Sequence, residues 1–178
     1  MSLDLYVFNV LNSFAGQGPV SDAVIVFFAT YLPFILVGWF ALYLVYKKEL
    51  SHRSKIVAFL LALLAGSIAR FAVTSPIRFF FPRDRPLAAM DITHLFIIEA
   101  PSFPSGHASF LFGFSTIVFF YNRTLGIVFY ICTVLVCAAR VAAGVHYPSD
   151  MIAGGVVGIV SAILVMYLLK KPLFKFKT

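Results

Sequence analysis

Residues 124–150 of this 178-residue chain read TLGIVFYICTVLVCAARVAAGVHYPSD, and this stretch decides the expected fold. It carries no charge until Arg140, and His146 and Asp150 follow near the end of the apolar run. An apolar run of about 20 residues is typical of a membrane-spanning helix. Charged groups in or near hydrocarbon are costly and are usually kept there by function. We therefore expect a membrane helix that ends at a functional site.

The composition indicates the same class for the whole chain. The sequence is 61% hydrophobic and 12% charged, and its mean hydropathy is +0.97. We expect one integral membrane domain, 1–178, built as an all-α polytopic helix bundle. The net charge of +7 comes largely from basic residues that flank the apolar runs, so membrane topology and anionic lipid explain it better than a nucleic-acid partner. The sequence leaves the oligomeric state open.

Apolar length predicts five spans. They run from about Ser21 to Tyr46, Lys55 to Phe81, Ser105 to Tyr121, Thr124 to Ala143 and Ser149 to Leu169. Residues 1–18 are too short to span, so we expect an amphipathic helix in the interface or a short sixth helix. Pro76 is expected to kink the second span, because proline lacks an N–H and clashes with the preceding turn.

The basic residues predict the orientation. Nine of the 14 Lys and Arg residues fall on one side of the five-span arrangement, in the loop 47–55, at Arg123 and in the tail 170–178. Short loops rich in Lys and Arg stay in the cytoplasm. We therefore expect a plasma (inner) membrane protein with its C-terminus inside and its N-terminus outside. The loop 82–104 is then extracytoplasmic.

Three polar segments lie at the outer ends of these spans. They are 78–86 (RFFFPRDRP), 104–107 (PSGH) and 140–150 (RVAAGVHYPSD). Because the span count places all three at one face, we expect residues that are far apart in sequence to form one site there. Two histidines, an aspartate and several arginines at one membrane face indicate phosphate chemistry.

The PSGH segment favours an anion site at the start of the third span. Pro104 suits a helix entry. Ser105 and Gly106 then lie where free backbone N–H groups and the helix dipole attract anions, and His107 follows in the first turn. A plain helix start with an interfacial histidine is the alternative.

His146 and Asp150 are expected to act as a pair. Their four-residue spacing lets the carboxylate reach one imidazole nitrogen. Such a contact fixes the tautomer and leaves the other nitrogen free as a nucleophile or base. A surface histidine beside a carboxylate at a helix N-terminus is the alternative.

Arg78, Arg85 and Arg140 form the candidate phosphate clamp. Guanidinium groups stay charged and bind phosphate oxygens bidentately. For one or two of these arginines, snorkelling to the interface is the alternative. Arg83 and Asp84 are instead expected to form a solvated pair in a tight turn.

A metal site is the competing use of two histidines and an aspartate. The histidine spacing does not match a zinc or two-metal site, and the chain has only seven acidic residues. We therefore expect neither a metal ion nor another cofactor.

Together these motifs resemble the type 2 phosphatidic acid phosphatase family, the membrane relatives of vanadium-dependent haloperoxidases. The family pattern is K-x6-RP, then PSGH, then SR-x5-H-x3-D. This chain has Arg78-x6-Arg85-Pro86, PSGH at 104–107 and Ala139-Arg140-x5-His146-x3-Asp150. The resemblance covers roughly residues 20–170. Arg78 in place of the usual Lys keeps the charge, and Ala139 in place of the usual Ser removes a hydroxyl.

The resemblance implies a haloperoxidase-like phosphatase core that works without metal. By the family pattern, His146 attacks phosphorus and forms a phosphohistidine, Asp150 orients it, and His107 protonates the leaving oxygen. The remaining residues of the pattern would hold the phosphoryl oxygens: Arg78, Arg85, Ser105, Gly106 and Arg140.

The small size and the long loop before PSGH resemble bacterial undecaprenyl-diphosphatases of this family. That resemblance implies hydrolysis of the terminal phosphate of undecaprenyl diphosphate at the extracytoplasmic face, which recycles the lipid carrier of peptidoglycan synthesis. The partners are then an isoprenoid or phospholipid phosphate and the bilayer. One alternative is a phosphatase acting on phosphatidate, phosphatidylglycerophosphate or lipid A. A non-catalytic lipid transporter or scramblase is the second alternative.

Two further features bear on the substrate. Arg70 lies eight residues before Arg78, ~12 Å along a helix, where it can touch a second phosphate, snorkel or join an internal pair. In the loop 87–103, the apolar residues Leu95 to Ile98 are expected to form a lid, a guide for lipid tails or a membrane-dipping loop.

Overall fold

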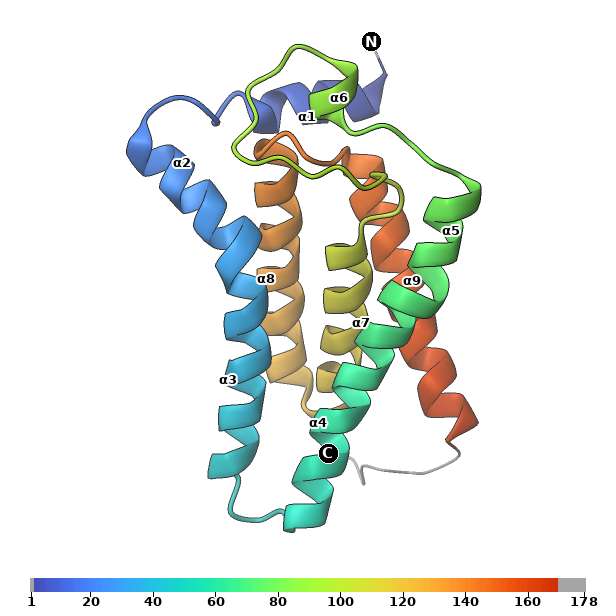
Figure 1. Cartoon of the computed structure of the whole chain (residues 1–178). Helices are drawn as coiled ribbons and strands as arrows, with labels where there is room; N and C mark the ends of the chain where they lie inside the picture. The colour runs from blue at the N-terminus through green and yellow to red at the C-terminus, as the bar shows by residue number, and fades with distance from the viewer. Residues whose placement is uncertain (1, 170–178) are drawn as a thin grey trace.

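The computed structural model describes residues 2–169, so Met1 and the predicted tail 170–178 lie outside the described residues. Every regular element within 2–169 is helical, which confirms the predicted all-α bundle (Figure 1). Two of the elements, η1 and η2, are π-helical. In chain order they are α1 (Leu3–Asn12), α2 (Pro19–Val26), η1 (Phe27–Tyr31), α3 (Leu32–Tyr46), α4 (His52–Ser67), η2 (Ile68–Thr74), α5 (Ser75–Phe80), α6 (Pro86–Ala89), α7 (Gly106–Tyr121), α8 (Arg123–Ala142) and α9 (Pro148–Leu168).

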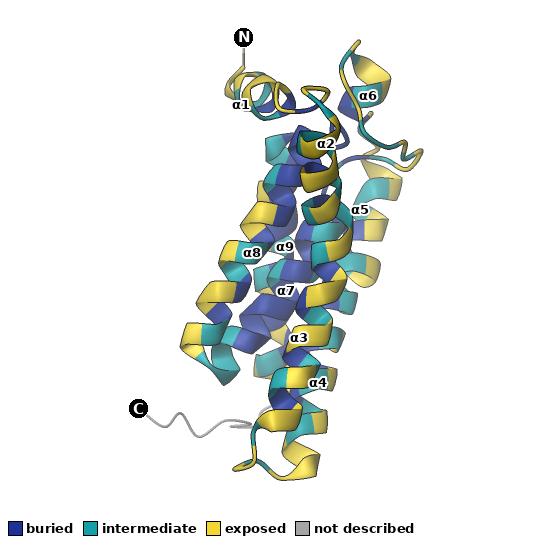
Figure 2. Ribbon diagram, turned by 90° about the vertical axis from the view of Figure 1, so that its left-hand side faces the viewer, coloured by how far each residue is buried: buried dark blue, intermediate teal, exposed yellow. Residues whose placement is uncertain are grey.

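Four continuous helices of the described chain are long and apolar enough to cross a membrane. They are Pro19–Tyr46, His52–Phe80, Arg123–Ala142 and Pro148–Leu168. They match four of the five predicted spans. Their outward faces are apolar: Phe34, Val156 and Leu168 are 72%, 57% and 64% exposed. Figure 2 shows exposed residues along the outer sides of the helices and buried ones within. Lipid suits such a surface and water does not, so the chain is a multi-pass membrane protein.

The remaining predicted span, the third in chain order, corresponds to α7 and is shorter than the others. Its 16 residues measure about 24 Å, which is less than most membrane-spanning helices need. It packs against α4, α8 and α9. Figure 1 shows α7 beginning below the upper ends of α8 and α9. The N-terminus of α7 therefore lies inside the bundle.

Small residues bring α7 and α9 into close contact. A Cβ atom added at Gly154 would lie 2.6 Å from the carbonyl oxygen of Ser105, and one added at Gly158 would lie 2.5 Å from that of Ser109. Small residues four apart allow this backbone approach between membrane helices. The contact sets the start of α9, which carries Asp150, against the start of α7.

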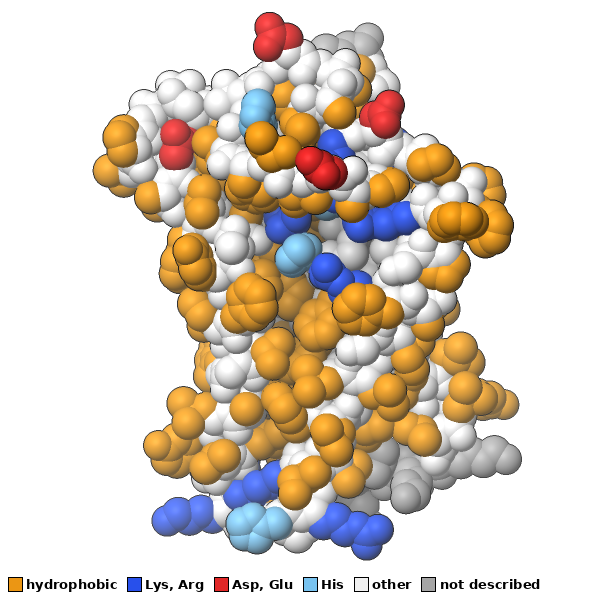
Figure 3. Space-filling view, in the orientation of Figure 1, with side chains coloured by type: hydrophobic (Ala, Val, Ile, Leu, Met, Phe, Trp, Pro, Cys, Tyr) orange, Lys and Arg blue, Asp and Glu red, His pale blue; other side chains and the backbone are white. Residues whose placement is uncertain are grey.

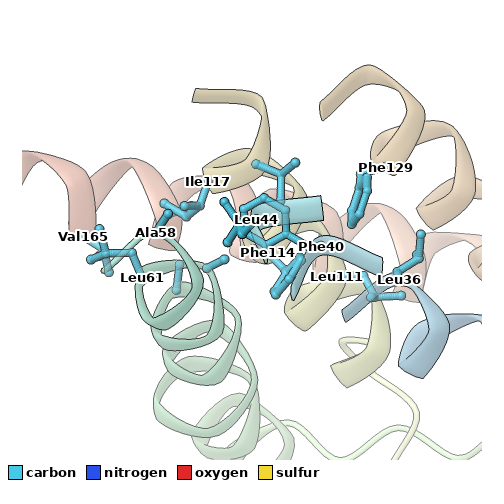
Figure 4. Close-up of a cluster of buried hydrophobic side chains, with 14 of the residues drawn as sticks. Leu36, Phe40, Leu44, Ala58, Leu61, Leu111, Phe114, Ile117, Phe129 and Val165 are labelled. Atoms are coloured by element: carbon cyan, nitrogen blue, oxygen red, sulfur yellow. The ribbon is translucent and has the colours of Figure 1, made fainter. Parts of the chain in front are cut away.

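Large apolar side chains fill the bundle between the helices (Figure 4). Phe40, Phe114 and Phe129 are fully buried, and the ring centroids of Phe40 and Phe114 lie 5.6 Å apart, edge to face. The residues labelled in Figure 4 come from α3, α4, α7, α8 and α9. One core therefore joins these five helices.

Proline accounts for both π-helical segments. η2 ends two residues before Pro76, and η1 ends two residues before Pro33. A proline removes one backbone donor and clashes with the carbonyl four residues back, so the turn before it widens. The structure thus has a π-helical segment before Pro76, while the predicted kink itself stays a prediction.

The N-terminal helix α1 lies across one end of the bundle (Figure 1). Phe8 is fully buried, with its ring centroid 5.8 Å from that of Tyr147. Asn12 donates to the carbonyl oxygens of Thr93 and Ala142, each at 2.8 Å. The predicted helix is therefore docked on the bundle, and its place at a membrane interface stays a prediction. We call this end the site end.

The opposite end of the bundle, which we call the basic end, carries the α3–α4 loop and the start of α8 (Figure 1). Figure 3 shows Lys and Arg side chains gathered there. The described basic residues that were predicted to be cytoplasmic lie in this loop, in the first turn of α4 and at the start of α8: Lys47, Lys48, Arg53, Lys55 and Arg123. The structure thus places the basic residues predicted to be cytoplasmic at one end of the bundle and the three polar segments toward the other end.

The Gly158→Ala substitution is expected to lower the free energy of unfolding by about 1–3 kcal/mol, because the added methyl group meets the Ser109 carbonyl on α7. Thermal unfolding in detergent measures the effect. Gly38→Ala on α3 is the control, since within residues 2–169 no atom of another helix lies within 4 Å of its Cβ position. Equal stability of the two variants would contradict the close packing of α7 on α9.

Candidate active site

The three polar segments predicted to converge meet at the site end. Nη1 of Arg85 lies 3.1 Å from Nε2 of His146, and the Ser105 N–H donates to the Asp150 carbonyl oxygen at 3.0 Å. Arg85, Ser105, Arg140, His146 and Asp150 are each at most 4% exposed. The structure thus joins the loop after α5, the start of α7 and the α8–α9 turn in one buried cluster.

The imidazole of His146 is held from both sides. Its Nδ1 lies 3.3 Å from Oδ2 of Asp150, while its Nε2 faces Arg85. A guanidinium can only donate, so Nε2 accepts and the ring proton stays on Nδ1. Burial, followed by the charges of nearby arginines, lowers the pKa of His146 well below its usual value. Nε2 therefore stays unprotonated at neutral pH and accepts a hydrogen bond from Arg85.

Asp150 connects the segments around it. Its Oδ2 also accepts from the Tyr147 N–H at 2.9 Å, and its Oδ1 accepts from Nη1 of Arg83 at 2.8 Å. Its main-chain carbonyl holds Ser105, as described above. The carboxylate of Asp150 thus fixes the turn that carries His146. The main-chain carbonyl of the same residue fixes Ser105, the residue just before α7.

The predicted solvated Arg83–Asp84 pair is wrong. Arg83 donates from Nη1 to Ser149 Oγ at 2.7 Å as well as to Asp150, and from Nη2 to Asp4 Oδ2 at 3.1 Å. The loop after α5 folds back over the start of α9, so the guanidinium, although partly exposed, meets the buried carboxylate of Asp150 and not Asp84. Arg83 is therefore a residue of the site that the sequence motifs did not identify.

Asp4 extends this network to α1. Its carboxylate accepts from the Ser149 N–H at 2.8 Å and from the Ser149 hydroxyl at 2.6 Å. Burial alone would raise the pKa of Asp4, but the hydrogen bonds from Ser149 and Arg83 outweigh burial and lower it. Asp4 therefore stays ionised and ties the N-terminal helix to the start of α9.

Arg78 and Arg85 also shape the loop before α7. Arg78 Nε donates to the Pro104 carbonyl at 2.9 Å, and Arg85 donates to the carbonyls of Ala100 and Pro101 at 2.6 and 3.2 Å. Burial lowers the pKa of Arg85 to about 10, so it remains charged at neutral pH. A guanidinium has five N–H groups, and each arginine keeps at least one for a ligand.

Arg140 carries an unpaired donor. Its Nη1 donates to the Ala29 carbonyl at 3.1 Å, but its buried Nε has no partner among residues 2–169. In a regular α-helix the Ala29 carbonyl would accept from residue 33, which is Pro33 and has no N–H. Buried charged donors are rarely left unsatisfied. The free Nε therefore indicates a place for an anionic ligand.

The start of α7 offers further donors. Ser105 is the N-cap, and its hydroxyl accepts from the Ala108 N–H at 3.4 Å. The N–H groups of Gly106 and His107 have no acceptor within the helix. The His107 imidazole is partly exposed and forms no hydrogen bond with another described residue, and the charges of Arg140 and Arg70 act on it. Figure 3 shows a recess just below the site end of the molecule, where basic and histidine side chains gather above an apolar surface.

The loop 87–103 roofs this cluster. Leu95 and Ile98 pack against the apolar residues at the end of α8, and the Leu95 N–H donates to the Ala143 carbonyl at 3.2 Å. The Arg140 guanidinium lies 5.7 Å from the Phe96 ring centroid. The loop therefore covers Arg140, while a lid motion stays a prediction.

Within residues 2–169, no group of three or more His, Cys, Asp or Glu side chains is arranged to hold a metal ion. Metal independence stays a prediction for experiment.

Comparisons with known proteins place the chain in a family. Residues 55–173 match the PAP2 superfamily. The chain is 26% identical over 180 residues to the putative undecaprenyl-diphosphatase YbjG of Escherichia coli (strain K12), covering 98% of this chain and 88% of that one. It is 25% identical over 176 residues to the bacitracin transport permease protein BcrC of Bacillus licheniformis, covering 97% and 83%.

Two crystal structures share the fold. Aquifex aeolicus LpxE superposes with a TM-score of 0.74 at 24% identity, covering 94% of this chain and 96% of that one. A PAP2 type phosphatidylglycerolphosphate phosphatase from Bacillus subtilis superposes with a TM-score of 0.67 at 19% identity, covering 98% and 87%. The family match spans most of this chain and confirms the resemblance seen in its motifs. The chain belongs to the PAP2 superfamily, and it is a membrane phosphatase of the PAP2 type.

Proposed function

We propose that this protein hydrolyses the terminal phosphate of undecaprenyl diphosphate through a phosphohistidine on His146, without a metal ion. The observation that carries the proposal is the buried Nε2 of His146, which keeps its lone pair beside Arg85. A buried, unprotonated nitrogen among several cations suits attack on a phosphate.

In the first step, Nε2 of His146 attacks phosphorus and the bond from phosphorus to the bridging oxygen breaks. Asp150 stabilises the positive charge that develops on the ring, since Nδ1–H faces its carboxylate. The Arg85 N–H that faces Nε2 turns to a phosphoryl oxygen. The free Nε of Arg140 and the spare donors of Arg78 hold the other oxygens.

His107 donates a proton to the leaving oxygen. The negative charge of the bound phosphate offsets the surrounding arginines and raises the affinity of the imidazole for that proton. In the second step, water attacks the phosphohistidine and returns its proton to His107. Inorganic phosphate leaves, and His146 is restored. The N–H groups of Gly106 and His107 at the start of α7 stabilise the charge in both steps.

An amphiphilic substrate suits the surroundings of the site. The recess with basic side chains lies directly above an apolar surface, so a lipid can place its phosphate in the recess with its tail in the bilayer (Figure 3). Among the relatives, YbjG is named a putative undecaprenyl-diphosphatase. That name, at 26% identity, favours an isoprenoid diphosphate over the other lipids.

The distribution of charge supports an extracytoplasmic site. Loops rich in Lys and Arg stay in the cytoplasm. The α3–α4 loop and the start of α8 lie at the basic end, opposite the His146 cluster (Figures 1 and 3). The site end, with α1, then faces the outside of the plasma membrane.

The purified protein is assayed in detergent with each of four lipids separately: undecaprenyl diphosphate, phosphatidate, phosphatidylglycerophosphate and lipid A. It is expected to release phosphate fastest from undecaprenyl diphosphate, at a rate that EDTA does not change. The His52→Gln variant, altered at the exposed basic end, should match the wild type, and His146→Gln should be inactive. A preference for another lipid would overturn the choice of substrate. Loss of activity in EDTA that divalent ions restore would overturn the metal-free mechanism. A protein that releases phosphate from none of these lipids would favour the transporter alternative.

The Arg83→Gln substitution is expected to lower kcat roughly 10- to 100-fold, because Asp150 loses its charged hydrogen bond from Nη1, and to leave KM unchanged. The reason is that Arg83 touches Asp150 and Asp4 but no substrate group. Steady-state kinetics measure both constants. Arg83→Lys should restore part of kcat, and Asp84→Asn, one residue away, is the control. A higher KM at unchanged kcat would show that Arg83 binds substrate instead.

A further inference from the structure

Arg70 is a charged residue in the middle of an apolar helix. It lies in η2, 18 residues after the start of the span His52–Phe80 and ten residues before its end. Among residues 2–169 its guanidinium has no hydrogen-bond acceptor and no carboxylate partner. It makes a cation–π contact with the ring of Phe71, whose centroid lies 5.5 Å from Cζ. A charge at such a depth is costly and is usually kept for a ligand or a partner.

The Arg70 side chain lies against the first residue of α7. A Cβ atom built at Gly106 would lie 3.6 Å from Arg70 Cγ and 3.7 Å from its Cζ and Nη1. The guanidinium is therefore in van der Waals reach of the helix start whose N–H groups are free. Arg70 borders the candidate site, although the family pattern does not include it.

The cluster holds more positive charge than one phosphate needs. The charge of Arg70 acts on His107, Arg78 and Arg140. Arg83 is shared by two carboxylates, those of Asp150 and Asp4. The cluster has five arginines in all, since Arg85 belongs to it, and five positive charges less these two negative ones leave three for the ligand, whereas a monophosphate ester carries only about two negative charges. A diphosphate carries more and would balance the cluster better.

The position of Arg70 matches the second phosphate of a diphosphate. Arg70 lies eight residues before Arg78 on the same helix, toward the middle of the bundle, and its guanidinium lies at the start of α7. When the terminal phosphorus faces His146, the leaving oxygen belongs to the phosphate that carries the lipid tail. His107 must reach that oxygen to protonate it, and Arg70 lies close enough to act on His107. The tail-side phosphate is thus expected beside Arg70.

We propose that Arg70 binds the lipid-attached phosphate of a diphosphate substrate and so makes the site selective for diphosphates over monophosphates. This inference rests on the proposed hydrolysis of a terminal phosphate at His146. Arg70 neutralises the charge left on the departing phosphate, which a monophosphate substrate does not have, because its leaving group is an alcohol.

The test compares farnesyl diphosphate with farnesyl monophosphate, which share one tail, as substrates of the wild type and of Arg70→Gln. We expect kcat/KM for the diphosphate to fall roughly 10- to 100-fold, the loss of one charged hydrogen bond, while the value for the monophosphate stays unchanged. Arg70→Lys should restore part of the loss. Arg53→Gln, exposed at the basic end of the same span, is the matched control. An equal loss for both substrates, or no loss for the diphosphate, would overturn the inference.

A binding arm separates this inference from the proposed function. Affinities for a non-hydrolysable farnesyl methylenediphosphonate and for a farnesyl phosphonate are measured by calorimetry in detergent. A preference of the wild type for binding the diphosphonate that disappears in Arg70→Gln supports the inference. This holds even when the wild type hydrolyses neither farnesyl compound, and in that case only the proposed reaction fails. The same affinity ratio in both proteins would contradict a role for Arg70. Thermal unfolding shows whether each variant is folded.

Discussion

Asp150 is the interaction point on which the rest of the site depends. Its carboxylate accepts from His146, from the Tyr147 N–H and from Arg83, and its main-chain carbonyl accepts from Ser105. Through these bonds it joins the α8–α9 turn, the loop after α5 and the start of α7. A buried carboxylate is unfavourable without partners, and here nearly every lone pair has one. One residue therefore sets both the orientation of the imidazole and the position of the helix start that faces it.

The bundle makes this arrangement possible by placing a helix start inside the protein. Gly154 and Gly158 let α9 approach the backbone of α7, and the short α7 begins below the ends of its neighbours (Figure 1). Free N–H groups and arginine side chains then share one enclosed space. Electrostatic attraction in such surroundings is stronger than in water. The same physics makes unpaired cations there costly, which is why the free Nε of Arg140 and the unpaired Arg70 are best explained by an anionic ligand.

Much of this was predictable, because hydropathy and motif spacing are local signals. Apolar runs located the long helices, and the spacing of His146 and Asp150 predicted their contact. The network of Asp4, Ser149 and Arg83 was not predictable, since it joins residues 145 positions apart and no periodicity records such a pairing. The bounds of α7 were predicted to within one residue, but its enclosure was not, because hydropathy does not distinguish a helix that faces lipid from one enclosed by other helices.

The central claim is that His146 carries the phosphoryl group between the two steps. The direct measurement is mass spectrometry of the protein after brief exposure to substrate and a quench in base, which preserves phosphohistidine. The His107→Gln variant is included because it should slow hydrolysis of the intermediate. The account predicts a phosphoryl group on His146 that is stable in base and lost in acid. Continued turnover with no phosphoryl group on His146, or with the group on another residue, would contradict it.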